Sequence, residues 1–313
     1  MSTMQRLQYH QYGGPEMMRL EHFDLGTPGK GELAIRVHFA AINPIDWKLR
    51  QGVMKMMTGQ KFPRAMGADF SGTVIAVGPD VTRFQPGDAV FGLSRFKESG
   101  ALGQALITKE TFVAKKPDGV SFEDAACLGT PGITAWGGLV DKARLAAGQR
   151  VFINGCAGAV GEATVQVARM HGATVAGSCG AADIERMRAL GVQTVYDYRA
   201  IDLSAVRERY DVVIDTAEKL TVEQATGLLN KNGVFLDLHP TPVKFLRALF
   251  NRRLKPVVGA PRAETLDNIA RAAGQGKFRL PIGRVAPLAA AAALITELEA
   301  GLKAGGKCLV KME

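Results

Sequence analysis

A glycine-rich loop is the part of this sequence whose residue types and spacing most clearly permit chemistry. The segment Gly155–Gly161 (GCAGAVG) follows the apolar run 150–154 and precedes a helical stretch, 160–171. Glycines let a backbone approach a pyrophosphate, and a helix start offers free amides and a positive dipole end. Cys156 replaces the first glycine of the usual G-x-G-x-x-G fingerprint. Because strand, loop, helix and second strand follow in order, we expect dinucleotide binding rather than a tight turn without a ligand. The expected contacts are Gly155, Ala157, Gly158, Ala159, Val160 and Gly161.

The end of the second strand indicates which dinucleotide is bound. The strand 173–176 is followed by the segment 177–180 (GSCG), which has no acid to bond a ribose 2′-hydroxyl. This small polar end leaves room for a 2′-phosphate, so the sequence predicts NADPH. Arg186 and Arg188, on the next helix, are candidate phosphate partners or part of a solvated helix face, whereas Asp183 argues mildly against NADPH. The expected contacts here are Ser178, Cys179, Gly180 and Arg186.

These loops require a particular order of strands and helices. From Ser121, a helix N-cap by its type, strand and helix alternate, with strands expected at 150–154, 173–176, 194–196, 210–215 and 233–238. This alternation predicts a parallel doubly wound sheet. The earlier residues form short β-branched runs between Gly and Pro turns, which indicates an antiparallel, barrel-like domain. The last strand, 308–311, could return to that domain. We therefore predict an α/β protein with a β-rich catalytic domain (1–121 with 278–313) and a dinucleotide-binding domain (122–277).

Length and composition exclude several classes of protein. The chain has 313 residues, 47% hydrophobic and 22% charged, which suits two domains with full cores and does not fit disorder, collagen or a coiled coil. The longest apolar run, 285–295, is far shorter than the roughly 20 residues of a membrane span. The first ten residues contain no apolar region of a secretory signal. The four cysteines are scattered and form no metal knuckle, so we expect a reduced, cytoplasmic protein.

The positive charge is unevenly distributed. The net charge is +9, and the segment 242–256 (PVKFLRALFNRRLKP) holds five cations and no acid. Its residues Phe245, Leu246, Leu249 and Phe250 share one helical face. Core packing is the preferred interpretation of that face, and a substrate-pocket wall, a subunit contact or weak membrane-surface binding are the alternatives. No nucleic-acid-binding motif accompanies the charge, so we expect no nucleic-acid partner.

Six segments, taken in order, resemble the zinc-independent medium-chain dehydrogenase/reductases, in the quinone oxidoreductase and enone (alkenal) reductase branch. They are 41–52 (AINPIDWKLRQG), 62–77 (FPRAMGADFSGTVIAV), 84–92 (FQPGDAVFG), 125–136 (AACLGTPGITAW), 154–161 (NGCAGAVG) and 305–310 (GGKCLV). The stretch 179–198 is most similar to the chloroplast-envelope-type quinone oxidoreductases, although Ala182 replaces an arginine usual there. The resemblance covers nearly the whole chain. It implies a GroES-like barrel domain, a Rossmann domain, and a homodimer or a monomer.

The resemblance also bears on metal binding. Zinc-dependent relatives bind catalytic zinc through a Cys, a Gly-His-Glu and a second Cys, and the matching positions here are Asn43, 67–69 (GAD) and Thr130. None of them supplies a thiolate or an imidazole, so no metal is expected. Without a Lewis acid to ionise an alcohol, reduction of an already polarised acceptor is favoured over simple alcohol oxidation.

The resemblance implies hydride transfer from NADPH to a small hydrophobic α,β-unsaturated ketone or aldehyde, or to a quinone. Asn43, Asp46 and Lys48 follow the strand 32–40 and are the candidate catalytic residues. Lys48 could bond the developing enolate oxygen, or it could be a surface lysine. Asp46 is expected to orient the loop.

Three more residues are expected near the cofactor. The resemblance puts Thr130 near the nicotinamide. Tyr198 follows the third strand and could contact the adenosine phosphate, and His239 follows the fifth strand, at the carboxyl edge where ligands of such sheets bind. Two other functions remain open: an enoyl-thioester reductase, and an RNA-associated nucleotide-binding protein without catalysis.

Overall fold

The computed structural model describes residues 4–206, 209–239 and 241–312. It divides into two compact units, Met1–Thr130 with Pro261–Glu313, and Pro131–Ala260. Each unit contains the sheet that its part of the sequence predicts.

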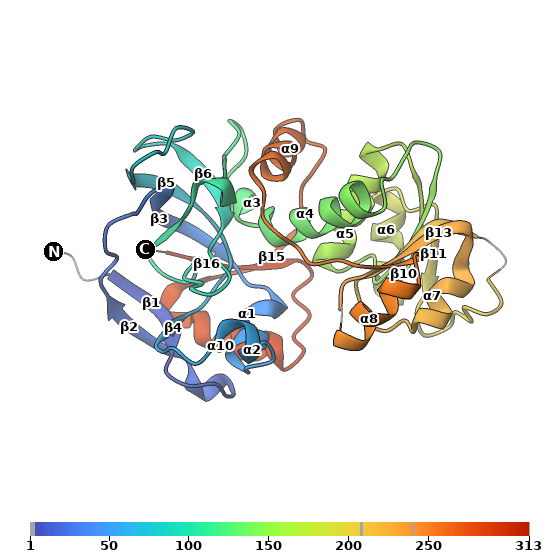
Figure 1. The fold of residues 1–313 in the computed structure, drawn as a ribbon, viewed down its shortest axis with the longest axis horizontal. Coiled ribbons are helices and arrows are strands. Elements are labelled where there is room, and N and C mark those ends of the chain that lie inside the picture. The colour runs from blue at the N-terminus through green and yellow to red at the C-terminus, as the bar shows by residue number, and fades with distance from the viewer. Residues whose placement is uncertain (1–3, 207–208, 240, 313) are drawn as a thin grey trace. The chain divides into compact units, whose positions relative to one another are not determined.

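The first unit is built on two sheets. Its strands are β1 (Met4–Tyr9), β2 (Arg19–Phe23), β3 (Glu32–Ala41), β4 (Arg64–Ala65), β5 (Asp69–Val77), β6 (Ala89–Leu93), β7 (Ala105–Lys109), β8 (Val113–Lys115), β15 (Ile282–Pro287) and β16 (Lys307–Lys311). One sheet has the order β15-β16-β3-β5-β6-β8, with β7 paired to β3, and the other has the order β2-β1-β4. The C-terminal strand β16 pairs antiparallel with β3, which confirms that the chain end returns to this domain (Figure 1).

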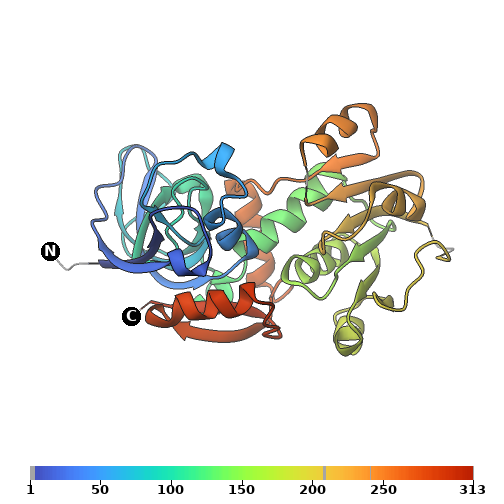
Figure 2. The same cartoon turned by 90° about the horizontal axis from the view of Figure 1, so that it is seen from below.

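Alternating side chains of these strands form the core of the first unit. Leu33, Ile35 and Val37 of β3 pack with Phe70 and Val74 of β5, because every second residue of a strand points to the same face. The helices of this unit are α1 (Pro44–Arg50), α2 (Lys55–Thr58), α3 (Phe122–Ala126), α9 (Ala263–Gly274) and α10 (Ala291–Glu299), with 3₁₀ turns at Pro15–Met17, Glu110–Phe112 and Leu288–Ala290. The helix α10 packs along β15 (Figure 2).

The second unit contains a six-stranded parallel sheet. Its strands are β9 (Arg150–Asn154), β10 (Thr174–Cys179), β11 (Thr194–Asp197), β12 (Tyr210–Asp215), β13 (Leu229–Asp237) and β14 (Leu254–Pro256). They run in the order β11-β10-β9-β12-β13-β14, so the strand order reverses beside β9, as in doubly wound dinucleotide-binding folds. The helices are α5 (Ala159–Met170), α6 (Ile184–Ala189), α7 (Val222–Leu228) and α8 (Pro242–Phe250), with a 3₁₀ turn at Ala181–Asp183. The helix α4 (Gly129–Trp136) runs across the boundary between the units and continues as a π-helix, Gly137–Lys142.

Two boundaries differ from those expected. The first unit keeps α3 and α9, which the sequence assigned to the dinucleotide-binding domain, because α3 packs on β3 and β5 and α9 packs on β8. The strand β10 runs three residues beyond its expected end. Ser178 and Cys179 therefore lie inside the strand, where they pair in register with Asn154 of β9 and Asp197 of β11.

The preferred interpretation of the amphipathic segment is wrong. Residues of α8 that were expected in the core are exposed: Phe245 by 47%, Leu246 by 59%, Leu249 by 75% and Phe250 by 86%. The pattern predicted the helix and its apolar face correctly but not the side that faces the protein. Among the described helices, none is both long enough and apolar enough to cross a membrane.

Candidate functional site

A row of buried polar side chains marks the carboxyl edge of the parallel sheet. Ser178, Asn154, Asp215 and Asp237 lie in register across β10, β9, β12 and β13. Ser178 Oγ donates to Asn154 Oδ1 (2.6 Å), and Asn154 Nδ2 donates to Asp215 Oδ1 (2.8 Å). Ligands of doubly wound sheets bind at this edge, beside the point where the strand order reverses.

The glycine-rich loop between β9 and α5 is fixed by close packing. Gly155 has a φ of +84°, a conformation that favours glycine. A Cβ on Gly161 would lie 2.2 Å from the Gly155 carbonyl oxygen, so helix and loop can approach only if that residue is glycine. Cys156 is fully buried, and its Sγ would lie 3.1 Å from a Cβ added at Gly177 of β10. Cys156, which replaces the first glycine of the fingerprint, therefore packs against the sheet. Burial there raises the pKa of its thiol.

The start of α5 fits a pyrophosphate. Gly158 is the N-cap residue, and a Cβ added there would meet one described atom within 4 Å, the Gly155 carbonyl oxygen at 3.6 Å. Space is thus open at the position where a side chain would obstruct a phosphate. The next amides, at Ala159, Val160 and Gly161, begin the helix and have no helical acceptor. Open space, free amides and the positive helix end together suit a dinucleotide.

A cavity of about 930 Å³ adjoins the loop within the second unit. Gly155, Ser178 and Tyr198 are the expected cofactor contacts in its wall, and Asn154 lies beside them. The remaining wall was not predicted and comes from the loop after β11, the loop after β12 and α7: Ile201, Asp202, Leu203, Ser204, Val206, Arg209, Ala217, Lys219, Leu220, Glu223, Gln224 and Gly227. The volume suits the adenosine half of a dinucleotide.

Arg186 on α6 and Arg199 after β11 differ in how they are paired. Arg186 forms ion pairs with Glu162 and, at 2.8 Å, with Asp183, so two carboxylates share its charge. Arg199, which was not expected at the site, lies with its guanidinium 4.9 Å from the centre of the Tyr198 ring. A single arginine in a loop belongs to no sequence pattern that would predict a ligand contact. Only its position directly after Tyr198, an expected cofactor contact, could have pointed to it.

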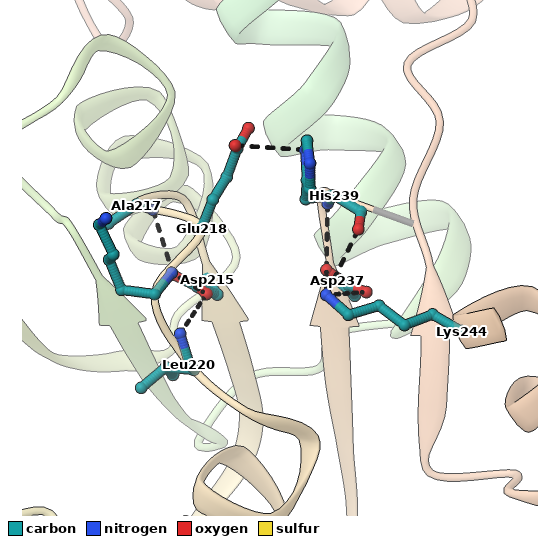
Figure 3. A network of polar contacts seen from close by, with 8 residues as sticks. Asp215, Ala217, Glu218, Leu220, Asp237, His239 and Lys244 are labelled. Carbon is teal, nitrogen blue, oxygen red and sulfur yellow. Dashed lines mark hydrogen bonds and ion pairs between the residues drawn. The ribbon is translucent and has the colours of Figure 1, made fainter. Parts of the chain in front are cut away.

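Side chains at the ends of β12 and β13 form a second polar network (Figure 3). Asp215 accepts hydrogen bonds from the amides of Ala217 (3.1 Å) and Leu220 (2.7 Å), which shapes one wall of the cavity. His239, expected at this edge, lies there: its Nδ1 is 3.2 Å from Glu218 Oε2, and its amide donates to Asp237. The pair joins the loops that follow β12 and β13.

A polar cluster in the first unit joins Asn43, Asp69 and Thr130, which the resemblance matches to the zinc-binding segments of zinc-dependent relatives. Asn43 Nδ2 donates to Asp69 Oδ2 (3.0 Å). Thr130 donates to Asp69 Oδ1 from its amide (2.9 Å) and its hydroxyl (2.6 Å). Lys307 Nζ donates to Asn43 Oδ1 (2.6 Å) and to the Ile42 carbonyl oxygen (2.9 Å). The residues of the cluster therefore bond to one another and to an ammonium group.

Asp46 extends this cluster as part of the capping box of α1. Its Oδ2 accepts a hydrogen bond from the Asn43 amide at 2.8 Å. Burial raises the pKa of Asp46 to about 7, and the nearby Asp69 carboxylate acts in the same direction. Burial also raises the pKa of Asp69, which Lys307 and the hydrogen bonds from Thr130 and Asn43 oppose.

The three candidate catalytic residues are therefore in different situations. The side-chain atoms of Asn43 are engaged with Asp69, Ala41 and Lys307, and Asp46 holds the Asn43 amide. Lys48 lies half-buried on α1. Lys307 was missed because a single lysine in the short strand β16 gives no sign that it is buried. In the part of the chain that the structure describes, no three His, Cys, Asp or Glu side chains gather as a metal site would require.

Comparisons with known proteins agree with this architecture. Residues 29–118 match the alcohol dehydrogenase GroES-like domain, and residues 190–310 match the zinc-binding dehydrogenase family. The chain is 30% identical over 306 residues to the chloroplast envelope quinone oxidoreductase homolog of Arabidopsis thaliana, which covers 92% of both proteins. It is 32% identical over 242 residues to the 2-methylene-furan-3-one reductase of Solanum lycopersicum, covering 74% of this chain and 61% of that protein. The structure of the quinone oxidoreductase from Coxiella burnetii matches with a TM-score of 0.89 and 27% identity over the whole of both chains.

The chain belongs to the medium-chain dehydrogenase/reductase superfamily and groups with its quinone oxidoreductase homologues. This confirms the predicted fold, a GroES-like domain with a Rossmann domain. Proteins of this superfamily are oxidoreductases that bind a nicotinamide dinucleotide. The open space at Gly158 and the free amides at the start of α5 are consistent with that cofactor.

Proposed function

We propose that the protein is an NADPH-dependent reductase that works without zinc and transfers a hydride to an α,β-unsaturated carbonyl compound or a quinone. The observation that carries the proposal is the cluster of Asn43, Asp69 and Thr130 with Lys307. An amide, one carboxylate and a hydroxyl are a poor donor set for zinc, and a bonded ammonium group repels a divalent cation. The relatives named for quinone and furanone reduction support the substrate class.

The environment of the second strand supports NADPH over NADH. The strand β10 ends at Cys179 without an acid for a 2′-hydroxyl. Gly180 follows, and a Cβ added there would lie 3.7 Å from Tyr198 Cε1. Arg199 on the Tyr198 ring would bring a cation to the 2′-phosphate. Arg186 remains a second candidate, although its charge is already shared by two carboxylates.

These contacts indicate a role for each group of residues in the reaction. When bound, NADPH supplies the hydride. The first amides of α5 would bind the pyrophosphate, and the wall of the cavity would hold the adenosine. Asn43 and Asp46 fix the loop between β3 and α1, because their polar atoms bond to each other and to their neighbours. Lys48 is then the candidate donor to the oxygen that becomes negative. Thr130 stays a proposed contact near the nicotinamide, and His239 stays a proposed cofactor contact at the carboxyl edge of the sheet.

The experiment that tests the function is a panel of enones, quinones, aldehydes and an enoyl-CoA thioester, with NADPH oxidation followed by absorbance. We expect turnover of an enone or a quinone, with NADPH preferred, no stoichiometric zinc in the purified protein, and no loss of activity in a chelator. Activity that zinc restores after chelation would overturn the proposal. Faster reduction of the thioester would favour an enoyl-thioester reductase, and binding without any turnover would favour a non-catalytic protein.

A variant pair tests the role of Lys48. Lys48→Met should lower kcat about tenfold or more while NADPH affinity stays unchanged, because the lost donor acts on the acceptor and not on the cofactor. Lys55→Met, which removes an exposed lysine of α2, is the matched control. Equal kcat values for the two variants would make Lys48 a surface residue. A homodimer or a monomer in the cytoplasm remains our prediction for the assembly and its location.

A further inference from the structure

The inner face of α8 is its polar side. Lys244 Nζ lies 2.9 Å from Asp237 Oδ2 at the end of β13, and the same ammonium donates to the His239 carbonyl oxygen (Figure 3). Ala248, one turn further along the helix, packs against the apolar core of the second unit. These two contacts fix the rotation of the helix about its axis, and α8 packs beside the edge strand β14.

The outer face of α8 is apolar. Val243 is 62% exposed, and Phe245, Leu246, Leu249 and Phe250 are exposed by 47 to 86%. At about 100° per residue, these five side chains span about 160° of the helix circumference, away from Lys244 and Ala248. Leaving such a continuous apolar face in water is unfavourable, which marks it as a surface for association.

The charges around this face favour an anionic partner. Arg247 flanks the apolar arc, and Arg252 follows the helix in an exposed position. Arg253 and Lys255 donate to backbone carbonyl groups, so neither charge is offset by a carboxylate in those bonds. The segment 242–256 has no acidic residue, and Arg247 lies 3.6 Å from the exposed Glu223.

We infer that α8 is a docking helix for an anionic lipid bilayer surface, with its five apolar side chains inserted among the acyl chains and its cations at the headgroups. An amphipathic helix that lies in the membrane plane has this combination of Phe and Leu on one side and basic residues at the rim. A second copy of the chain fits less well, because a symmetric contact through α8 would bring together two segments that each carry five cations and no acid. The inference is independent of the reaction proposed above.

Vesicle co-sedimentation tests the inference on the full chain. Vesicles of phosphatidylcholine with about 30% phosphatidylglycerol should bind the protein, and pure phosphatidylcholine should bind it at least about tenfold more weakly. Phe250→Glu should reduce binding to the anionic vesicles at least about tenfold, since it puts a charge into the inserted face. Met56→Glu is the matched control: Met56 is 97% exposed on α2, and the change in net charge is the same.

Each outcome of this experiment decides for or against the inference. Loss of binding in Phe250→Glu alone, with an unchanged thermal midpoint and unchanged NADPH affinity, supports a bilayer contact through α8. Equal binding to both kinds of vesicle, equal loss in the two variants, or no binding of the wild type would overturn it. Light scattering after gel filtration measures whether the apolar face of α8 binds a second copy of the chain instead. If the wild type is a dimer and Phe250→Glu is a monomer, the face is a subunit contact and the inference is overturned.

Discussion

Replacing Asp46 by asparagine should remove a large part of the pH dependence of the unfolding free energy. Burial raises the pKa of Asp46 from 3.8 to about 7, with a smaller contribution from Asp69. Between these pH values the folded chain keeps a proton that the unfolded chain releases. The resulting stabilisation is complete below pH 3.8 and is lost as the pH rises through about 7. A pKa difference of this size corresponds to about 4 kcal/mol.

Urea unfolding of both proteins from about pH 4 to about pH 8 measures this effect. Asparagine has no proton to lose and keeps an oxygen that can accept from the Asn43 amide, which now bonds to Oδ2 at 2.8 Å. Relative to the wild type, Asp46→Asn should become more stable as the pH rises, by up to about 4 kcal/mol across the range. Asp118→Asn, which removes an exposed carboxylate from the same unit, should change far less. A stability difference between Asp46→Asn and wild type that is independent of pH would refute the reasoning.

Three further substitutions test the cofactor site and the buried cluster. Gly158→Val should abolish most NADPH binding in a fluorescence titration, because the new side chain enters the open space at the start of α5. The thermal midpoint should stay near that of the wild type. An unchanged NADPH affinity would mean that the loop is only a turn. Gly180→Asp should lower the ratio of NADPH to NADH affinity, and the uncharged Gly180→Asn should not; equal ratios for the two variants would exclude charge as the cause. Lys307→Met should lower the unfolding free energy by about 3 kcal/mol in urea, because Asn43 Oδ1 and the Ile42 carbonyl oxygen lose their donor and the buried carboxylates lose their cation. A loss of less than about 1 kcal/mol would show that other contacts hold the cluster.

The parallel sheet was predictable because its signals are local. The strand β9 has the predicted bounds, 150–154, since a short apolar run before a glycine-rich turn has few other uses in a chain that alternates strand and helix. The expected helix start at Ser121 is also present, where the side chain accepts a hydrogen bond from the Asp124 amide. The three-residue strand β14 was missed, because its pairing with β13 depends on the tertiary fold and leaves little pattern in the sequence.

The side chains of the candidate site were less predictable than its backbone. The loop needs glycine at fixed positions, and that requirement is visible in the sequence. The pairing of Arg186 with Glu162 is not, because the two residues lie on different helices and meet only after the sheet has formed. The orientation of α8 was missed for a similar reason. Periodicity defines an apolar face, but the ion pair between Lys244 and Asp237 determines that this face points outward.

The polar cluster shows how a resemblance and a structure complement each other. The resemblance gave the positions Asn43, 67–69 and Thr130, where no thiolate or imidazole stands, but it did not say what balances a buried carboxylate there. The structure supplies that partner: Lys307 on β16 places one ammonium group at Asn43 Oδ1 and close enough to oppose the rise in the pKa of Asp69. One ammonium can offset one carboxylate, and burial raises the pKa of the second, Asp46, to about 7, which favours its protonated form below neutral pH. The cation from β16 and a proton on Asp46 therefore both reduce the net negative charge of this buried cluster. This is why Lys307 and Asp46, neither of which stands at a zinc-ligand position, are the residues whose replacement should disturb the cluster most.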